Sequence, residues 1–272
     1  MKVKYTLCGT LILAWLTLFL PWVNAETVTF GANESPPYWS QNLPENGMCG
    51  AIVQAISKEA GLTSVIQFKP LKRLIADDAN NDLGNPEFYL KRQDFAAIIP
   101  IAVTQAAFFY YRPNHREKIS LQSLDDLKRY KIGALKGTLS DHSLFAAAGI
   151  RFEQSSTQTS LLKKLKLGRI DLYFELDLVG RQAIRSVFPG EADDFGSMAV
   201  ARSVAPIAIM IAGNHPDGKA MGDRYREGLK KIINNGSYLK ILENYYGTDA
   251  VPENWYGELA RFQRLYAFEG EK

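Results

Sequence analysis

The stretch GANESPPYWS, residues 31–40, brings together side chains that can recognise a small molecule. Asn33 supplies an amide and Glu34 a carboxylate, and both groups can accept a hydrogen bond from a ligand. Tyr38 and Trp39 supply aromatic faces, which attract apolar surface and cations. The two prolines before them fix the backbone, so that such a loop loses little conformational entropy on binding. An equally good alternative is that the aromatic pair closes the bottom of a hydrophobic core.

The turn KGTLSD, residues 136–141, offers a different chemistry. It leads into an expected helix at 139–148, and the free N–H groups at the start of a helix favour an anion. Gly137 allows a ligand to approach the backbone closely, and Thr138 follows it. The sequence therefore indicates an anion-binding turn, with the alternative that Thr138 only caps its own helix.

Two acids stand at the end of the segment GRIDLYFELD, residues 168–177, whose centre is an expected strand. Glu175 and Asp177 stand at the end of that strand, where a side chain can face a ligand. Asp177 has an alternative role as the N-cap of the next helix. Asp171, at the start of the strand, is interpreted as structural.

Catalytic and cofactor motifs are weak. His115, His142 and His215 are scattered and lack zinc-ligand spacing. Ser140 and Asp141 directly precede His142, and chain neighbours do not reach one another in the geometry of a catalytic triad. The chain has no G-x-S-x-G, Walker or G-x-G-x-x-G pattern. We therefore expect no cofactor, no bound metal and no enzyme activity.

The first 25 residues have the pattern of a secretory signal peptide. Basic residues precede a mostly apolar run at 11–20, and Val23-Asn24-Ala25 resembles a cleavage site. The alternative is an uncleaved anchor, but the run is shorter than the roughly 20 residues that span a bilayer. We expect cleavage near Ala25 and a periplasmic protein.

Removal of residues 1–25 would leave 247 of the 272 residues and lower the net charge from +3 to about +1. A chain so close to neutrality shows no electrostatic preference for nucleic acid. Cys49 would then be the last cysteine, which rules out an internal disulfide and requires a packed core. We expect a monomer, and no role for Cys49 follows from the sequence.

Expected strands and helices alternate along the chain, which indicates α/β architecture with parallel-rich sheets flanked by helices. The alternation restarts midway, so we expect two lobes joined by two short hinge crossings. The predicted first lobe comprises 26–105 plus 206–272, and the second comprises 106–205. The expected strands are 27–32, 64–68, 96–101, 106–111, 131–134, 150–153, 170–174 and 207–212, and the expected helices lie near 51–60, 71–80, 139–148, 159–168, 178–188, 222–234 and 237–246.

An ordered series of segments resembles one protein family. The series is GANESPPYWS, GMCGAIVQAISKEAGL at 47–62, PLKRL at 70–74, SLDDLKRYKIGALKGTLSD at 123–141, LLKKLKLGRIDLYFELD at 161–177 and GLKKIINNGSYLKILENYYG at 228–247. In order and spacing it resembles family 3 of the periplasmic solute-binding proteins, the amino-acid-binding type that serves ABC transporters. The resemblance covers nearly all of the chain after residue 25. It implies a two-lobed, type II-like periplasmic binding protein fold with a ligand cleft between the lobes.

The resemblance also implies roles for the candidate residues. Each loop contributes one kind of contact: a hydrogen-bond acceptor from Asn33 or Glu34, an apolar wall from Tyr38 or Trp39, carboxylate binding by Gly137 and Thr138, and a partner for a ligand amine in Glu175 or Asp177.

One family feature is missing. Amino-acid binders of this type carry T-x-x-R, whose arginine forms a forked pair with the ligand carboxylate. Phe88 stands where that arginine is expected after Pro86-Glu87, and the other candidate segment ends in Ala107. Arg73 or Arg92 could substitute from a nearby turn. We predict that ordinary α-amino acids are not held by the usual clamp, and that a more apolar or cationic ligand is preferred.

The resemblance therefore implies capture of a small polar ligand, amino-acid-like or an amine or carboxylate, by hinge closure for a membrane permease. Two alternatives remain. One is an enzyme on the same scaffold that uses a cleft acid, Glu34 or Glu175. The other is a sensory module that docks on a separate receptor.

Overall fold

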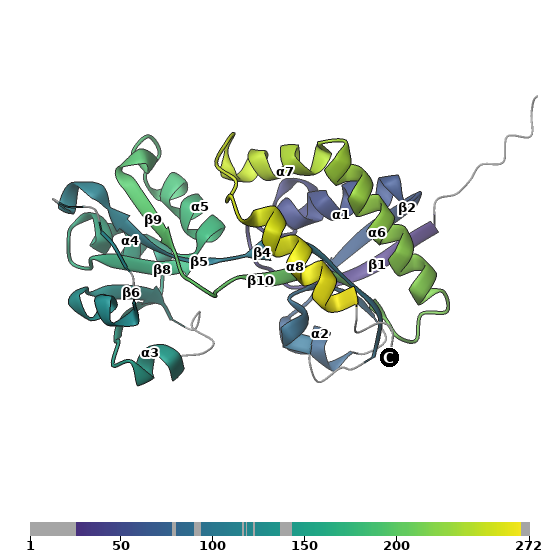
Figure 1. Ribbon diagram of the computed structural model, residues 1–272, viewed down its shortest axis with the longest axis horizontal. Helices are drawn as coiled ribbons and strands as arrows, with labels where there is room; N and C mark the ends of the chain where they lie inside the picture. The colour runs from purple at the N-terminus through teal and green to yellow at the C-terminus, as the bar shows by residue number, and fades with distance from the viewer. Residues whose placement is uncertain are drawn as a thin grey trace, which may run out of the picture.

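The computed structural model describes residues 26–77, 80–89, 94–115, 117, 119–121, 123–136 and 143–267. They form two lobes, each built on a five-stranded sheet with helices on its faces. Figure 1 shows the lobes side by side along the longest axis. The expected signal peptide, Arg92, Gly137 and Thr138 lie outside the described residues.

The first sheet has the strand order β2-β1-β3-β10-β4. Its strands are β1 (Glu26–Ala32), β2 (Leu62–Phe68), β3 (Asn81–Gly84), β4 (Phe95–Thr104) and β10 (Ala205–Ala212). Four of them run parallel, whereas β10 pairs antiparallel with both β3 and β4. The reversed strand is the one that returns from the other lobe.

The second sheet repeats this plan with the order β7-β6-β8-β5-β9. Its strands are β5 (Ala106–Tyr111), β6 (Ile132–Leu135), β7 (Phe152–Ser155), β8 (Leu172–Leu176) and β9 (Phe195–Ala199). Here β5, which arrives from the first lobe, is the antiparallel strand. The two-lobed α/β fold with parallel-rich sheets is therefore confirmed.

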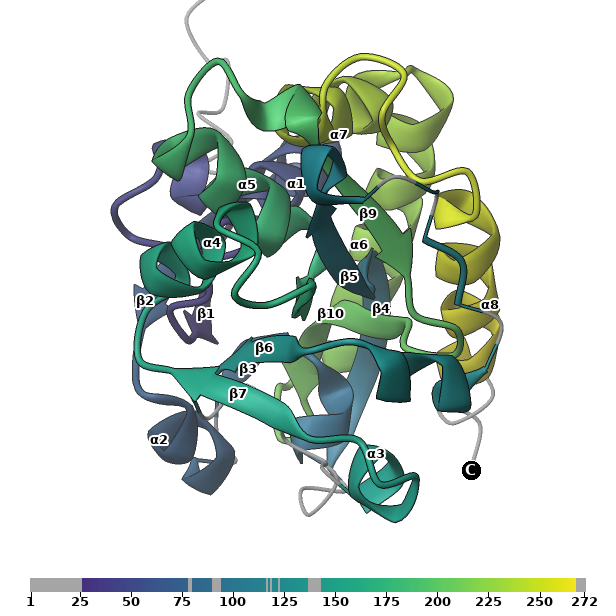
Figure 2. The ribbon, with the colours of Figure 1, turned by 90° about the vertical axis from the view of Figure 1, so that its left-hand side faces the viewer.

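Five helices pack on the first sheet: α1 (Met48–Glu59), α2 (Leu71–Ala76), α6 (Gly218–Asn234), α7 (Ser237–Tyr246) and α8 (Trp255–Ala267). All except α2 cover one large core, while Leu74 of α2 and Tyr89 belong to a smaller core. The second sheet carries α3 (Ser143–Ala147), α4 (Gln158–Lys166) and α5 (Asp177–Val187). Figure 2 shows α4 and α5 together, well apart from α3.

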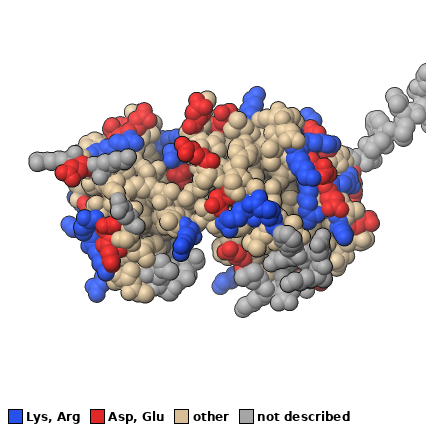
Figure 3. All heavy atoms as spheres, in the orientation of Figure 1, with Lys and Arg blue, Asp and Glu red and all other residues tan. Residues whose placement is uncertain are grey.

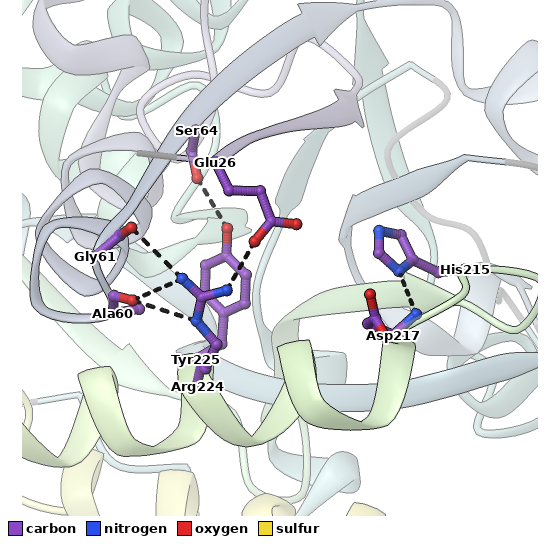
Figure 4. A network of polar contacts seen from close by, with 8 residues as sticks. All are labelled: Glu26, Ala60, Gly61, Ser64, His215, Asp217, Arg224 and Tyr225. Atoms are coloured by element: carbon purple, nitrogen blue, oxygen red, sulfur yellow. Dashed lines mark hydrogen bonds and ion pairs between the residues drawn. The ribbon is translucent and has the colours of Figure 1, made fainter. Parts of the chain in front are cut away.

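Arg224 of α6 connects the start of β1 with the segment just after α1 (Figure 4). Its guanidinium donates to the carbonyl oxygens of Ala60, at 3.3 and 3.1 Å, and of Gly61, just after α1. It also pairs with Glu26 of β1 at 2.7 Å. A cation at the carboxyl end of a helix is favourable, so this contact stabilises the packing of α6 against α1.

Several helix boundaries follow from local signals. Gly168 has φ +66° just after α4, as its expected role as a helix stop requires. The start of α4 differs from the prediction, because Thr157 caps it and accepts a hydrogen bond from the Ser160 N–H at 3.2 Å. Asp177 is the first residue of α5 and not its N-cap, since Leu176 holds that position. Asp171 is structural, with its carboxylate accepting from the Lys131 N–H at 2.8 Å.

The chain passes between the sheets at Gln105 and at 200–204. Hydrogen bonds pin both passages: the Asp177 N–H donates to the Gln105 carbonyl, and the Val200 N–H to the Ala106 carbonyl, each at 2.8 Å. The lobe limits of 26–105 plus 206–272 and 106–205 stay a prediction about which segments move as rigid units. Within the described part of the chain, none of the helices has the length and apolar character to cross a membrane.

Candidate functional site

The candidate site lies between the two lobes, where the carboxyl ends of the parallel strands in the two sheets face each other. Strand β4 leads out of the first lobe toward the second, and β1 and β3 run in the same direction as β4, so they also end on the side facing the second lobe. Strand β9 leads back, so β6 and β8 end on the side facing the first lobe. Ligands of open α/β sheets bind beyond the carboxyl ends of the strands. Figure 3 shows a notch between the lobes, open at the lower edge of the view.

The proline-containing loop follows β1 at this edge. Its backbone forms a tight turn, in which the Ser35 N–H donates to the Trp39 carbonyl at 2.8 Å and the Tyr38 N–H to the Ser35 carbonyl at 3.0 Å. The loop then accepts hydrogen bonds from the start of α1, because Met48 and Cys49 donate to the carbonyls of Pro37 and Tyr38, at 2.9 and 3.0 Å. The helix therefore holds the loop in place, as a preorganised contact surface requires.

The two polar candidates of this loop differ in exposure. Glu34 is exposed, and one of its carboxylate oxygens accepts from the Gln41 N–H at 3.0 Å. Asn33 is half-buried, and its amide donates to the Glu34 carbonyl at 3.2 Å. Both side chains keep acceptor capacity beyond these bonds. Their ligand contacts stay a prediction.

Tyr38 and Trp39 lie in the core of the first lobe, with 1% and 2% of their surface exposed. Burial raises the pKa of the Tyr38 hydroxyl, and the neighbouring Tyr246 raises it further, with a smaller contribution from Asp177. This placement matches the alternative in which the aromatic pair closes a core. A ligand-facing role for either ring stays a prediction that requires some movement of the loop.

Glu175 is buried at the end of β8, with 7% of its surface exposed. Its carboxylate accepts from the Tyr173 hydroxyl at 3.0 Å, from the Gln158 amide at 3.2 Å and from the Leu176 N–H at 2.9 Å. These three donors are all neutral, so the hydrogen bonds solvate the negative charge without compensating it. A buried carboxylate in this state favours a cationic partner.

Asp177 has a cationic partner within its own helix. The Nε–H of Arg181 donates to both carboxylate oxygens, at 2.9 and 3.0 Å. Burial raises the pKa of Asp177, and the guanidinium of Arg181 opposes that rise. Of the two acids, Glu175 is therefore the better candidate for a ligand amine.

The substitution of Arg73 or Arg92 for the missing arginine stays a prediction. Arg73 is exposed on α2, and Arg92 lies outside the described residues. Phe88 has half of its surface exposed after β3, in the first lobe. Ala107, the other position where the arginine is expected, lies in β5 of the second sheet and pairs with Glu175 of β8. It therefore belongs to the second lobe.

The sequence interpretation missed a set of residues on α5 that contact the first lobe. Asp177, Arg181 and Arg185 recur every four residues and therefore share one helix face. Arg185 donates to the carbonyls of Tyr245 and Tyr246 at the end of α7, at 2.9 and 2.7 Å. The four-residue spacing was visible in the sequence, but its partner helix was not.

Comparison with known proteins gives matches in structure only. No protein-family model matches the chain, and no curated protein matches it in sequence. The arginine-, lysine-, histidine-binding protein ArtJ from Geobacillus stearothermophilus is 16% identical, with a TM-score of 0.54, over 86% of this chain and 100% of that one. An ancestral cationic amino acid solute-binding protein, AncCDT-1, is 15% identical, with a TM-score of 0.60, over 80% and 95%.

A third match is a histidine kinase sensor domain described as similar to periplasmic binding proteins. It is 17% identical, with a TM-score of 0.54, over 82% of this chain and 97% of that one. Matches at these identities establish the fold. The chain therefore has the two-lobed fold of these binding proteins, which confirms the fold that the sequence resemblance implied.

Proposed function

We propose that this protein is an extracytoplasmic solute-binding protein that captures a small polar ligand between its two lobes. The observation that carries the proposal is that the carboxyl ends of the parallel strands in both sheets face each other across two strand crossings. Contacts from both lobes to one ligand would favour the closed form. The ligand would then be delivered to an ABC-type permease.

The proposed ligand class rests on Glu175 at the end of β8. Glu175 is a buried carboxylate whose described donors are neutral, so it suits an amine or another cationic group. ArtJ is an arginine-, lysine-, histidine-binding protein and AncCDT-1 is a cationic amino acid solute-binding protein, which agrees with this chemistry. The turn at Gly137 and Thr138 would hold a carboxylate, and Asn33 or Glu34 a ligand donor.

A sensory role is the second candidate, and the match to a histidine kinase sensor domain favours it specifically. Ligand capture and lobe closure would be the same, but the closed form would dock on a receptor instead of a permease. A pull-down with the ligand-saturated protein, against membranes that contain either candidate partner, separates the two roles. The neighbouring genes give the same distinction.

The test of ligand capture is a thermal-shift screen over amino acids, amines and small carboxylates, followed by calorimetry. A ligand at a hundredfold excess over its Kd should stabilise the protein by about 2.7 kcal/mol. Glu175→Gln should weaken binding of a cationic ligand at least about tenfold, whereas Glu117→Gln, at an exposed site, should not. An equal effect of both variants, or no stabilising ligand in any class, contradicts the proposal.

A further inference from the structure

The second lobe contains a cavity of about 290 Å³ that the proposed ligand cleft does not use. It lies between α5, the edge strand β9 and the segment that follows β5. Three arginines are among the residues that line it: Arg112, Arg181 and Arg185. The loop at 33–40 and Glu175 do not contribute to its walls, whereas Arg181 and Ser197 also line a neighbouring pocket that reaches residues 250–254 of the first lobe.

The three guanidinium groups have N–H donors that their hydrogen bonds within the protein do not use. Arg112 donates to the backbone carbonyl of Asp193, and Arg185 donates to two carbonyls at the end of α7. Both are therefore bonded to neutral oxygens. Arg181 bonds to Asp177 through Nε and to the Ser197 hydroxyl through Nη2 at 3.0 Å. Each guanidinium has five N–H donors, more than these contacts occupy.

The charge of the cavity is positive. Its walls carry three arginines and one acid, the exposed Asp193. Asp177 lies just outside and is already paired with Arg181. Including that acid still leaves one positive charge in excess.

The remaining walls suit a compact, partly apolar ligand. Phe109 and Phe195 are buried and form part of the lining, and Ser197 adds a hydroxyl. Planar guanidinium groups bind carboxylate and phosphate groups through paired hydrogen bonds. We propose that this cavity binds a small oxyanion, through its carboxylate or phosphate group, at a second site distinct from the interlobe cleft.

The test is calorimetric titration of the unliganded protein with inorganic phosphate and with succinate, at constant ionic strength set by chloride. Saturable binding of either probe is expected, and the probe that binds identifies the group recognised. Arg112→Gln should weaken binding at least about tenfold, because a charge-assisted hydrogen bond is lost. Arg151→Gln, an exposed arginine at the start of β7 on the opposite edge of the sheet, makes the same charge change away from the cavity and should have no effect.

Amide chemical shifts locate the site in the same samples. The probe should move the resonances of Gly196 and Ser197, and Arg112→Gln should abolish the movement while the rest of the spectrum stays folded. Absence of saturable binding by both probes overturns the proposal. Equal weakening by Arg112→Gln and Arg151→Gln also overturns it, because the attraction would then be non-specific. Saturable binding that Arg112→Gln leaves unchanged would place the probe elsewhere, for example in the interlobe cleft, and would also overturn the proposal.

Discussion

The two lobes share one sheet plan but differ in how they are packed. In the first lobe, α1, α6, α7 and α8 cover a single large core. In the second lobe, two smaller cores lie under fewer helices, one with α4 and α5 and the other with α3. Two sheets of the same plan are therefore covered by different numbers of helices. The first lobe therefore has the larger hydrophobic core. The second lobe has less buried apolar packing and contacts the first lobe through α5.

Matched core truncations test this difference most strongly. Leu242 of α7 and Leu162 of α4 are both fully buried. Changing either to alanine should lower the free energy of unfolding by about 2–5 kcal/mol, with the larger loss at Leu242 because the thicker core collapses less readily around a cavity. Urea unfolding measures both losses. Equal losses would mean that the amount of helical cover does not control the energetics.

Two spectroscopic signals can also distinguish the unfolding of the first lobe from that of the whole protein. Trp39 and Trp255 both lie in the first lobe, and the other two tryptophans of the chain lie within residues 1–25. Fluorescence of the chain that starts at residue 26 therefore follows the first lobe alone, whereas far-ultraviolet circular dichroism follows both. If Leu162→Ala shifts the two signals equally, the lobes unfold as one unit.

Buried tyrosine hydroxyls give a second matched pair. Tyr238 donates to the Ile101 carbonyl at 2.7 Å and accepts from the indole N–H of Trp255 at 3.0 Å. Tyr238→Phe leaves both groups without this partner and should cost about 1–3 kcal/mol. Tyr173→Phe removes one of three donors to Glu175 and should cost about 0.5–1.5 kcal/mol. Denaturant unfolding gives both values, and a larger cost at Tyr173 would reverse the comparison.

The contact between lobes predicts a change in shape rather than in stability. Arg185→Gln removes two hydrogen bonds from α5 to the end of α7. Because Arg185 is exposed, the cost should be below about 1 kcal/mol. The radius of gyration of the unliganded protein should increase in small-angle scattering, as the lobes separate, while Arg151→Gln leaves it unchanged. An unaltered radius in Arg185→Gln would mean that this contact does not restrain the lobes.

The smallest predicted effect is a pH dependence at Asp177. Burial raises its folded pKa above the usual 3.8, so the native state holds the proton more tightly than the unfolded chain. The free energy of unfolding contributed by this group therefore decreases as pH rises from 3.8 through the raised folded pKa. Stability curves measured against pH should lose this decrease in Asp177→Asn. They should keep it in Asp249→Asn, at an exposed position whose left-handed backbone asparagine tolerates.

Much of the fold could be predicted because its signals are local. The apolar run at 106–111 is strand β5, and Ser237–Tyr246 is helix α7, both with the expected limits. The missed strands β3 and β9 are short, and β9 contains a glycine, so neither has a sustained apolar pattern. Helix α8 was missed although it buries Trp255, Leu259, Phe262 and Tyr266 at helical spacing.

The candidate site was less predictable because it depends on contacts between distant segments. The sequence indicated two possible acids at the end of β8, but only the structure shows that Asp177 is paired and that Glu175 has neutral donors. It could not show that Tyr38 approaches Tyr246, more than two hundred residues later. The antiparallel direction of β10 follows from the return of the chain between lobes, which no local pattern encodes.

The pairing of Thr104 with Ala205 has a consequence for the order of folding. These facing residues bracket the whole second lobe, which is one continuous segment, whereas the first lobe needs both ends of the chain. If the second lobe folds first, it acts as a short turn that brings β4 and β10 together. Shortening an effective loop from about one hundred residues to a few lowers its closure cost by roughly 3 kcal/mol. The less heavily packed lobe would thus nucleate the more heavily packed one.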